Sequence, residues 1–214
     1  HGGAANAHWY DFVAQGFTAD YHVRAVDLRG HGDSQWDPSP TPSYGYQQHA
    51  ADVNALAETL DLRDFVLIGH SMGGMLATRY ALQYPDAVEQ LVLVNPIGLE
   101  DWQAEGVPYA SIDTMAEGER KTTFDSIKAY QLKFYYDGQW APRYDRWVDM
   151  LAGMYAGPDR EIVAWNQAQT SEMVFTQPVV HEFPKLRVPT LLMIGGKDRT
   201  APGANRAPEA VAAR

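Results

Sequence analysis

The chain has 214 residues, a formal net charge of −10, 45% hydrophobic and 21% charged residues, and no cysteine. These proportions are those of ordinary globular domains and argue against a disordered or fibrous protein. The acidic balance argues against nucleic acid and anionic membranes as partners. The lack of thiols excludes disulfides, thiolate zinc sites and a cysteine nucleophile.

Short apolar runs alternate with helical patterns along the first two-fifths of the chain. Tyr21–Asp27 is rich in strand-forming residues and predicts a strand, whereas Leu28–Pro42 is dense in loop formers. Apolar residues spaced by three and four positions between 53 and 60 predict an amphipathic helix. Phe65–Ile68 is apolar without alternation, which is typical of a strand buried on both faces of a parallel sheet.

A second helix is predicted over Met72–Gln83, because Pro85 disfavours helical geometry in the residue before it. Leu91–Val94 and Thr190–Ile194 are further buried strands. Strands separated by helices predict an α/β fold with a mainly parallel sheet, flanking helices and right-handed crossovers. At the end of the chain, Asn205–Arg214 has the pattern of an opening helix.

The long stretch between the last two strands predicts a separate helical unit. Residues 97–183 carry many aromatic residues, from Trp102 to Trp165. We expect this segment to form a cap over a pocket, with residues 1–96 and 184–214 as the core domain. The rings could equally form the small core of a helical subdomain, and both interpretations can hold together.

The strongest functional signal is the segment Gly69–Gly74, Gly-His-Ser-Met-Gly-Gly, which lies between a predicted strand and a predicted helix. This is the context of a G-x-S-x-G nucleophile elbow. The turn is so tight that Ser71 should adopt a strained backbone, and residues two before and two after it must be small. The elbow residues around Ser71 are Gly69, His70, Gly73 and Gly74. The alternative is an ordinary glycine-rich turn.

On these residues the chain resembles the serine-nucleophile branch of the α/β-hydrolase fold family over nearly its whole length. Three more segments match the family in order. His1-Gly2-Gly3 resembles its oxyanion turn, Asp27–Ser34 resembles the D-x-R-G-x-G-x-S loop, and Gly195–Asp198 resembles the turn that carries the catalytic acid.

The resemblance implies a role for each matching residue. Ser71 would be the nucleophile that forms an acyl-enzyme. The backbone amides of Met72 and of Gly3, or alternatively Ala4, would form the oxyanion hole.

The catalytic acid implied by the resemblance is Asp198, which would orient a catalytic histidine. The alternative for Asp198 is a solvated turn carboxylate. Asp101 and Glu100, which follow another strand, are weaker choices for the acid.

The sequence departs from the family pattern in one respect, because no histidine follows Asp198. His70 should point away from Ser71, His1 and His31 are expected to be structural, and His181 is the one weak candidate for the base. We therefore expect a fragment that lacks flanking N-terminal strands and whose catalytic histidine lies beyond Arg214. Such a fragment should be nearly inert, since loss of the base can lower kcat by about 10⁶.

The expected activity is hydrolysis of a carboxylic ester or related acyl substrate (EC 3.1.1), without cofactor or metal. The aromatic cap favours an apolar or aromatic acyl group. Carbon–carbon bond hydrolase, lactonase, haloperoxidase or perhydrolase, and acyltransferase activities share the same triad and stay open. A non-catalytic ligand-binding protein on the same scaffold is the alternative from another class. The lack of cysteine and of a visible signal peptide favours the cytoplasm. The oligomeric state cannot be read from the sequence.

Overall fold

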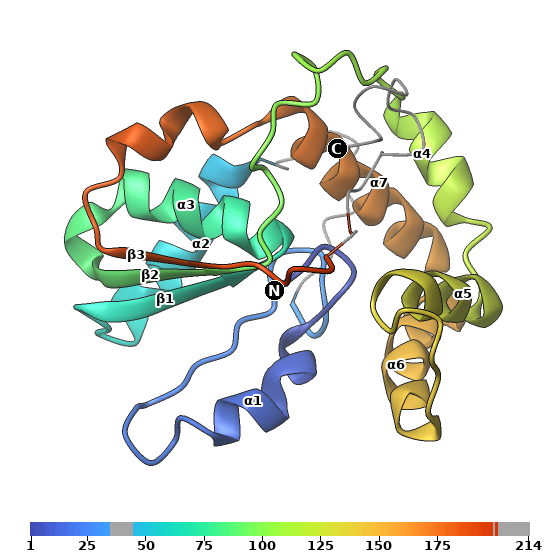
Figure 1. Cartoon of the computed structure of the whole chain (residues 1–214), viewed down its shortest axis with the longest axis horizontal. Coiled ribbons are helices and arrows are strands. Elements are labelled where there is room, and N and C mark those ends of the chain that lie inside the picture. The colour runs from blue at the N-terminus through green and yellow to red at the C-terminus, as the bar shows by residue number, and fades with distance from the viewer. Residues whose placement is uncertain (35–44, 199, 201–214) are drawn as a thin grey trace.

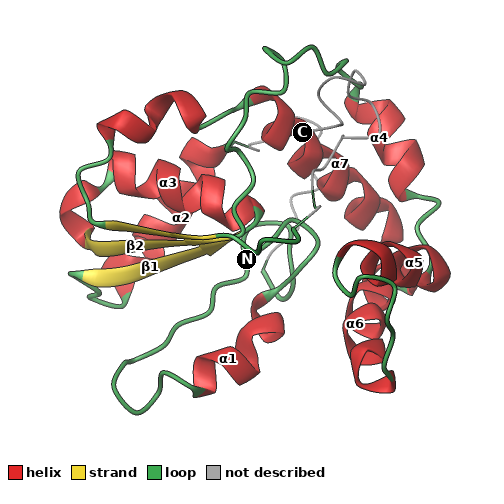
Figure 2. Ribbon diagram, viewed as in Figure 1, coloured by secondary structure: helices red, strands yellow, loops and turns green. Residues whose placement is uncertain are grey.

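The computed structural model describes residues 1–34, 45–198 and 200, and in them the chain forms an α/β fold around a parallel sheet (Figure 2). The sheet order is β1-β2-β3, formed by Phe65–His70, Val88–Val94 and Thr190–Met193. β2 lies between two parallel neighbours. The predicted burial of the other two strands is wrong, because β3 is exposed along its length and Ile68 of β1 is 52% exposed, and in the described residues each of these strands has a single neighbour in the sheet. The α/β class that the alternating pattern predicts is confirmed.

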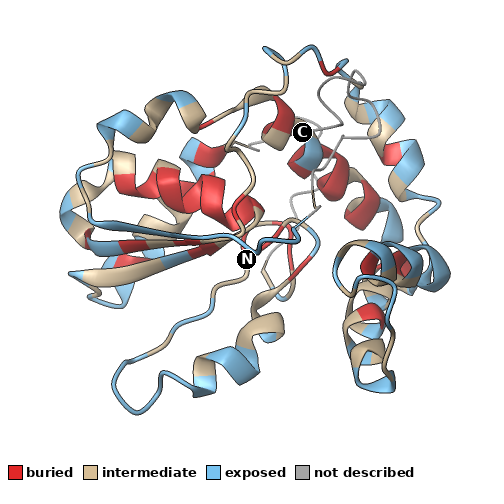
Figure 3. Ribbon diagram, in the orientation of Figure 1, coloured by how far each residue is buried: buried red, intermediate tan, exposed pale blue. Residues whose placement is uncertain are grey.

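One layer of helices covers the sheet. α3 (Met72–Gln83) packs against β1 and β2, and α2 (Tyr46–Thr59) packs against α3. α3 has the bounds that the sequence predicts, and the chain turns at Pro85 into the short helix η2 (Pro85–Ala87). The main core lies in these layers (Figure 3), and its largest fully buried side chains include Tyr46, Met72, Met75, Tyr80 and Leu91.

The predicted strand Tyr21–Asp27 is wrong, because these residues form no ladder in the structure. They run as irregular backbone beside α2, where Arg24–Arg29 and α2 residues such as Leu56 line an open groove. A strand exists only when a neighbour accepts and donates its ladder hydrogen bonds. Local β propensity therefore did not decide the conformation here.

Helices fill the stretch between β2 and β3. They are α4 (Ile112–Glu119), α5 (Phe124–Phe134), η3 (Pro142–Tyr144), α6 (Asp145–Ala156), α7 (Arg160–Thr176) and η4 (Val180–Lys185). Ile127, Val148, Tyr155 and Val163 form a small core shared by α5, α6 and α7. The rings of Tyr136 and Tyr144 stack with their centroids 3.9 Å apart, and Trp140 packs edge-on against both. Several of the aromatic residues therefore serve packing within this unit.

Two polar contacts fasten η4 to the sheet side of the molecule. Arg79 on α3 makes a bidentate ion pair with Glu182. Asp101, in the loop after β2, contacts His181 Nε2 at 2.8 Å. These contacts fix the path by which the chain returns from α7 to β3.

The first residues after the amino-terminal turn contact the helical unit. η1 (Ala7–Tyr10) leads directly into α1 (Asp11–Gln15). The rings of Trp9 and Phe12 lie 5.5 and 6.0 Å from the ring of Trp147 on α6. This segment therefore bridges the sheet side and the helical unit.

Within the described part of the chain, none of the helices combines the length and the apolar character needed to cross a bilayer. The predicted helix Asn205–Arg214 lies outside the described residues, as does most of the predicted loop after Ser34.

The central position of β2 leads to a prediction about stability. Leu91 is 0% exposed and pairs with both neighbouring strands. Leu91→Ala should lower the free energy of unfolding by about 2–5 kcal/mol, because it removes buried methyl groups and leaves a cavity. Urea unfolding of the variant would measure this change. Glu89→Ala, at an exposed position of the same strand, is the control and should change stability by under about 0.5 kcal/mol. Equal effects of the two substitutions would contradict the assigned core.

Candidate active site

Ser71 stands at the junction of β1 and α3, where the chain reverses direction at the carboxyl end of the sheet. Its φ is 55° and its ψ is −121°, a left-handed conformation that costs free energy for any residue other than glycine. Ser71 is the N-cap of α3, yet its side chain makes no capping hydrogen bond. The hydroxyl therefore stands at the positive end of a helix without being used to hold that helix.

The glycines around Ser71 are required by close backbone approach. A Cβ on Gly69 would lie 2.7 Å from Ala77 Cβ and closer still to the carbonyl of Gly73. A Cβ on Gly73 would lie 2.6 Å from the carbonyl oxygen of His1. The absence of side chains thus lets β1, α3 and the amino-terminal turn meet at Ser71.

The turn His1–Gly3 lies against Ser71 and Met72. A Cβ on Gly2 would be 3.7 Å from Ser71 Oγ, and a Cβ on Gly3 would be 3.5 Å from Met72 Sδ. The carbonyl of Gly2 accepts a hydrogen bond from the His1 ring at 2.7 Å. In a trans peptide the next N–H points the opposite way, so the Gly3 amide faces away from that ring. Gly3 and Met72, the two proposed oxyanion donors, are therefore neighbours beside Ser71, whereas Ala4 is exposed.

A buried histidine holds the carbonyl side of this turn. His31 is 0% exposed, and its Nε2 lies 2.8 Å from Gly3 O and its Nδ1 3.0 Å from Arg29 O. Burial lowers the pKa of His31. The His1 ring completes the connection, because its Nε2 accepts from Leu28 N at 3.0 Å. His31 and His1 thus link the oxyanion turn to the loop after residue 27.

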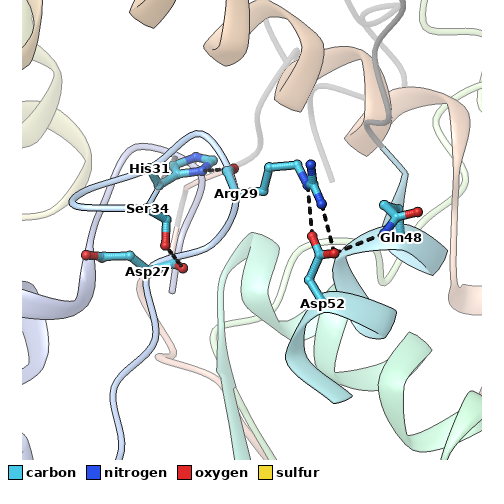
Figure 4. Close-up of polar contacts among 6 residues, drawn as sticks. All are labelled: Asp27, Arg29, His31, Ser34, Gln48 and Asp52. Carbon is cyan, nitrogen blue, oxygen red and sulfur yellow. Dashed lines mark hydrogen bonds and ion pairs between the residues drawn. The ribbon is translucent and has the colours of Figure 1, made fainter. Parts of the chain in front are cut away.

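The loop of residues 27–34 is organised by Asp27 and Arg29 (Figure 4). The Asp27 carboxylate accepts hydrogen bonds from Ala7 N at 2.6 Å and from Asp33 N at 3.0 Å. The backbone carbonyl of Asp27 accepts a hydrogen bond from the Ser34 hydroxyl at 2.7 Å.

Arg29 extends from the same loop to α2. It donates two hydrogen bonds of 2.9 Å to the carboxylate of Asp52, which also accepts from Gln48. Burial acts to raise the pKa of Asp52, but the hydrogen bonds from Arg29 and Gln48 outweigh it and hold that pKa below its ordinary value of 3.8.

His70 is engaged by Tyr10 rather than by Ser71. The Tyr10 hydroxyl and His70 Nδ1 form a hydrogen bond of 2.8 Å. Burial lowers the pKa of His70, with the charge of Asp198 acting in the opposite direction, and burial raises the pKa of Tyr10 to about 12. A neutral His70 with Nδ1 as acceptor fits this hydrogen bond. The sequence offered no signal for Tyr10, which is 60 positions away from its partner.

Asp198 lies in the turn after β3, at the same end of the sheet as Ser71. Its N–H donates to Gly195 O at 3.0 Å, and the N–H of Gly195 donates to Asn95 Oδ1 at 2.8 Å. The carboxylate is exposed and accepts from Thr200 N at 2.8 Å. Its charge opposes the larger effect of burial, which lowers the pKa of His70, and it adds to the effect of burial in raising the pKa of Tyr130.

The weaker acid and base candidates pair with each other. The hydrogen bond from His181 lowers the pKa of Asp101, and Glu100 lines a small cavity beside Trp102. All seven histidines lie in the described residues, and none of them forms a hydrogen bond with Ser71 there. The described ranges also hold no group of three or more His, Asp or Glu residues arranged for a metal ion.

Comparisons with known proteins agree on one family. The model of the alpha/beta hydrolase fold family matches residues 1–210. A probable hydrolytic enzyme from Pseudomonas aeruginosa PAO1 is similar in structure with a TM-score of 0.94 and 50% identity, covering 100% of this chain and 68% of that one.

The relatives found by sequence include two that match most of this chain. A non-heme chloroperoxidase of Streptomyces lividans is 32% identical over 208 residues, covering 88% of this chain and 68% of the relative. The AB hydrolase superfamily protein YisY of Bacillus subtilis (strain 168) is 30% identical over 185 residues, covering 83% of this chain and 64% of the relative. The match thus spans about two thirds of the length of these relatives.

The lack of space for a side chain at Gly69 leads to a second prediction. Gly69→Ala should lower the free energy of unfolding by about 1–3 kcal/mol, because the added methyl overlaps Ala77 and the Gly73 carbonyl. Gly118→Ala in α4 is the matched control, since a Cβ there meets nothing within 4 Å. The control should gain about 0.5–1 kcal/mol from better helix propensity. Thermal and urea unfolding would measure both, and a neutral Gly69→Ala would refute the tight turn.

The Asp52 carboxylate leads to a prediction about pH. A group whose pKa is depressed on folding stabilises the fold above its unfolded pKa, and this contribution is lost as the pH falls through the folded pKa. Asp52→Asn should therefore cost about 1 kcal/mol at neutral pH and lose less stability than the wild type on going to about pH 3. Urea midpoints at the two pH values test this. Asp20→Asn, at an exposed position, should leave the pH profile unchanged.

Proposed function

Because the chain belongs to the alpha/beta hydrolase fold family, we propose that it is a serine hydrolase that cleaves a carboxylic ester or related acyl substrate through an acyl-enzyme on Ser71. The observation that carries the proposal is the left-handed Ser71, with an uncommitted side chain at the start of α3 and with Gly2 and Gly3 against it. This is the arrangement that a nucleophile and its oxyanion donors require.

In the proposed reaction, Ser71 Oγ attacks the acyl carbon and loses its proton to a base. The charge that develops on the carbonyl oxygen is held by the N–H groups of Met72 and Gly3, and each such donor contributes about 10²–10³ in rate. The alcohol leaves with the proton that the base received. Water then attacks the acyl-enzyme and releases the acid and the free Ser71 hydroxyl.

The proposed triad assigns the acid to Asp198, which would hold a histidine in the required tautomer. Its place at the carboxyl end of the sheet, where its charge acts on His70, supports that role. None of the chain's seven histidines bonds to Ser71 in the described residues. The proposed mechanism thus needs a base from outside residues 1–214, and it is stated for the full-length protein.

A second candidate activity is supported by the similarity to a non-heme chloroperoxidase. The same acyl-enzyme attacked by hydrogen peroxide instead of water gives a peracid and free Ser71. Product analysis with and without peroxide would separate this perhydrolase activity from simple hydrolysis. The site geometry is common to both.

The proposal is tested by covalent labelling. A fluorophosphonate probe should label the full-length protein at one serine, because the activated Oγ displaces fluoride from phosphorus and the base takes up the proton. Ser71→Ala should abolish the labelling, whereas Ser126→Ala, which removes a capping hydroxyl at α5, should retain it. Mass spectrometry locates the adduct. An unlabelled wild type would favour the non-catalytic binding protein, and labelling that survives in Ser71→Ala would place the nucleophile elsewhere.

A further inference from the structure

α7 carries polar side chains in a place where apolar ones would be expected. The helix runs between the sheet with its covering helices and α4, α5 and α6 (Figure 1). Gln169 is 2% exposed and Thr170 is 3% exposed. Among the described residues, the side-chain amide nitrogen and oxygen of Gln169 have no hydrogen-bond partner, and the hydroxyl of Thr170 has none either. Two buried polar side chains, consecutive in the sequence, thus have unsatisfied hydrogen-bonding groups.

Thr170 lies against the turn that holds the proposed oxyanion donor. Its Cγ2 methyl is 3.3 Å from the position of a Cβ on Gly3, and Met72 Sδ lies 3.5 Å from that same position. The hydroxyl is attached to the same carbon as this methyl. Threonine in a helix occupies two χ1 rotamers, and rotation can bring the hydroxyl toward the turn.

An unsatisfied buried hydroxyl lowers stability, since it has lost its water without gaining a partner. Valine has nearly the same shape and would remove that cost. The side-chain amide of Gln169 carries a larger penalty of the same kind, because it has two donors and an acceptor to satisfy. An unsatisfied buried hydroxyl beside a reactive centre, such as that of Thr170, is typical of a binding site that its ligand completes.

We propose that Thr170 and Gln169 form a hydrogen-bonding subsite for the acyl part of the substrate. The substrate class is an acyl ester that carries a hydroxyl group close to its carbonyl. A hydroxyl both donates and accepts, as do the threonine hydroxyl and the glutamine amide. The inference rests on the proposed function, because it places the acyl group beside Gly3. It replaces the apolar or aromatic acyl group that the aromatic content favours.

The test compares two esters that differ in a single hydroxyl, 4-nitrophenyl 3-hydroxybutanoate and 4-nitrophenyl butanoate, on the full-length protein. The wild type should prefer the hydroxy ester in kcat/KM. Thr170→Val should lower that preference by about tenfold or more, because the hydroxyl of the substrate is then buried without its partner. Thr170→Ser, which keeps the hydroxyl, should retain the preference. Gln169→Met should lower it as well.

Stability provides the readout that separates binding from structure. Thr170→Val should keep or raise the Tm, since it removes an unsatisfied hydroxyl, while it loses the preference for the hydroxy ester. A preference that is unchanged in Thr170→Val, or activity that falls equally on both esters, would overturn the subsite and leave the proposed function standing. A wild type that turns over neither ester and takes no fluorophosphonate would overturn the proposed function and the subsite with it.

Discussion

The left-handed backbone of Ser71 is the constraint on which the arrangement of the site depends. Such a conformation costs of order 1–3 kcal/mol and persists only where the surrounding structure enforces it. Here the enforcement comes from β1, which is paired along its length with β2, and from α3, whose residues from Met72 to Thr78 are buried. The glycines at 69 and 73 remove every atom that would push these elements apart. The strain is therefore held by the packing of the whole sheet layer.

The elements that sequence reasoning located correctly are those whose signal is local. The end of α3 follows from Pro85, and the positions of the strands β1, β2 and β3 follow from uninterrupted apolar runs. The prediction failed at Tyr21–Asp27, where the composition favours a strand but the described residues provide no ladder partner. Strand formation is a property of a pair of segments, and one segment alone cannot reveal it.

The same limit explains which parts of the candidate site could be predicted. A motif with fixed spacing singled out Ser71, and a resemblance linked it to Gly3 and Asp198. Tyr10 and Thr170 escaped notice because each reaches the elbow or the oxyanion turn across a long stretch of chain. The sequence around each of them has only the pattern of an ordinary helix or loop. The partnership of Asp101 with His181, 80 positions apart, was equally invisible, although each residue had drawn attention alone.

The two polar contacts of η4 restrict how the helical unit can move. Since Glu182 is fastened to α3 and His181 to the loop after β2, the returning chain is anchored just before it re-enters the sheet. The segment between α7 and η4 is fixed as well, since Gln177 Oε1 accepts from Tyr46 N at 2.9 Å and Val179 is 0% exposed in the main core. The carboxyl end of α7, the helix that places Thr170 against Gly3, is therefore held by α2, by α3 and by the loop after β2. The position of Thr170 beside the oxyanion turn is thus set by the same packing that sets the position of Ser71.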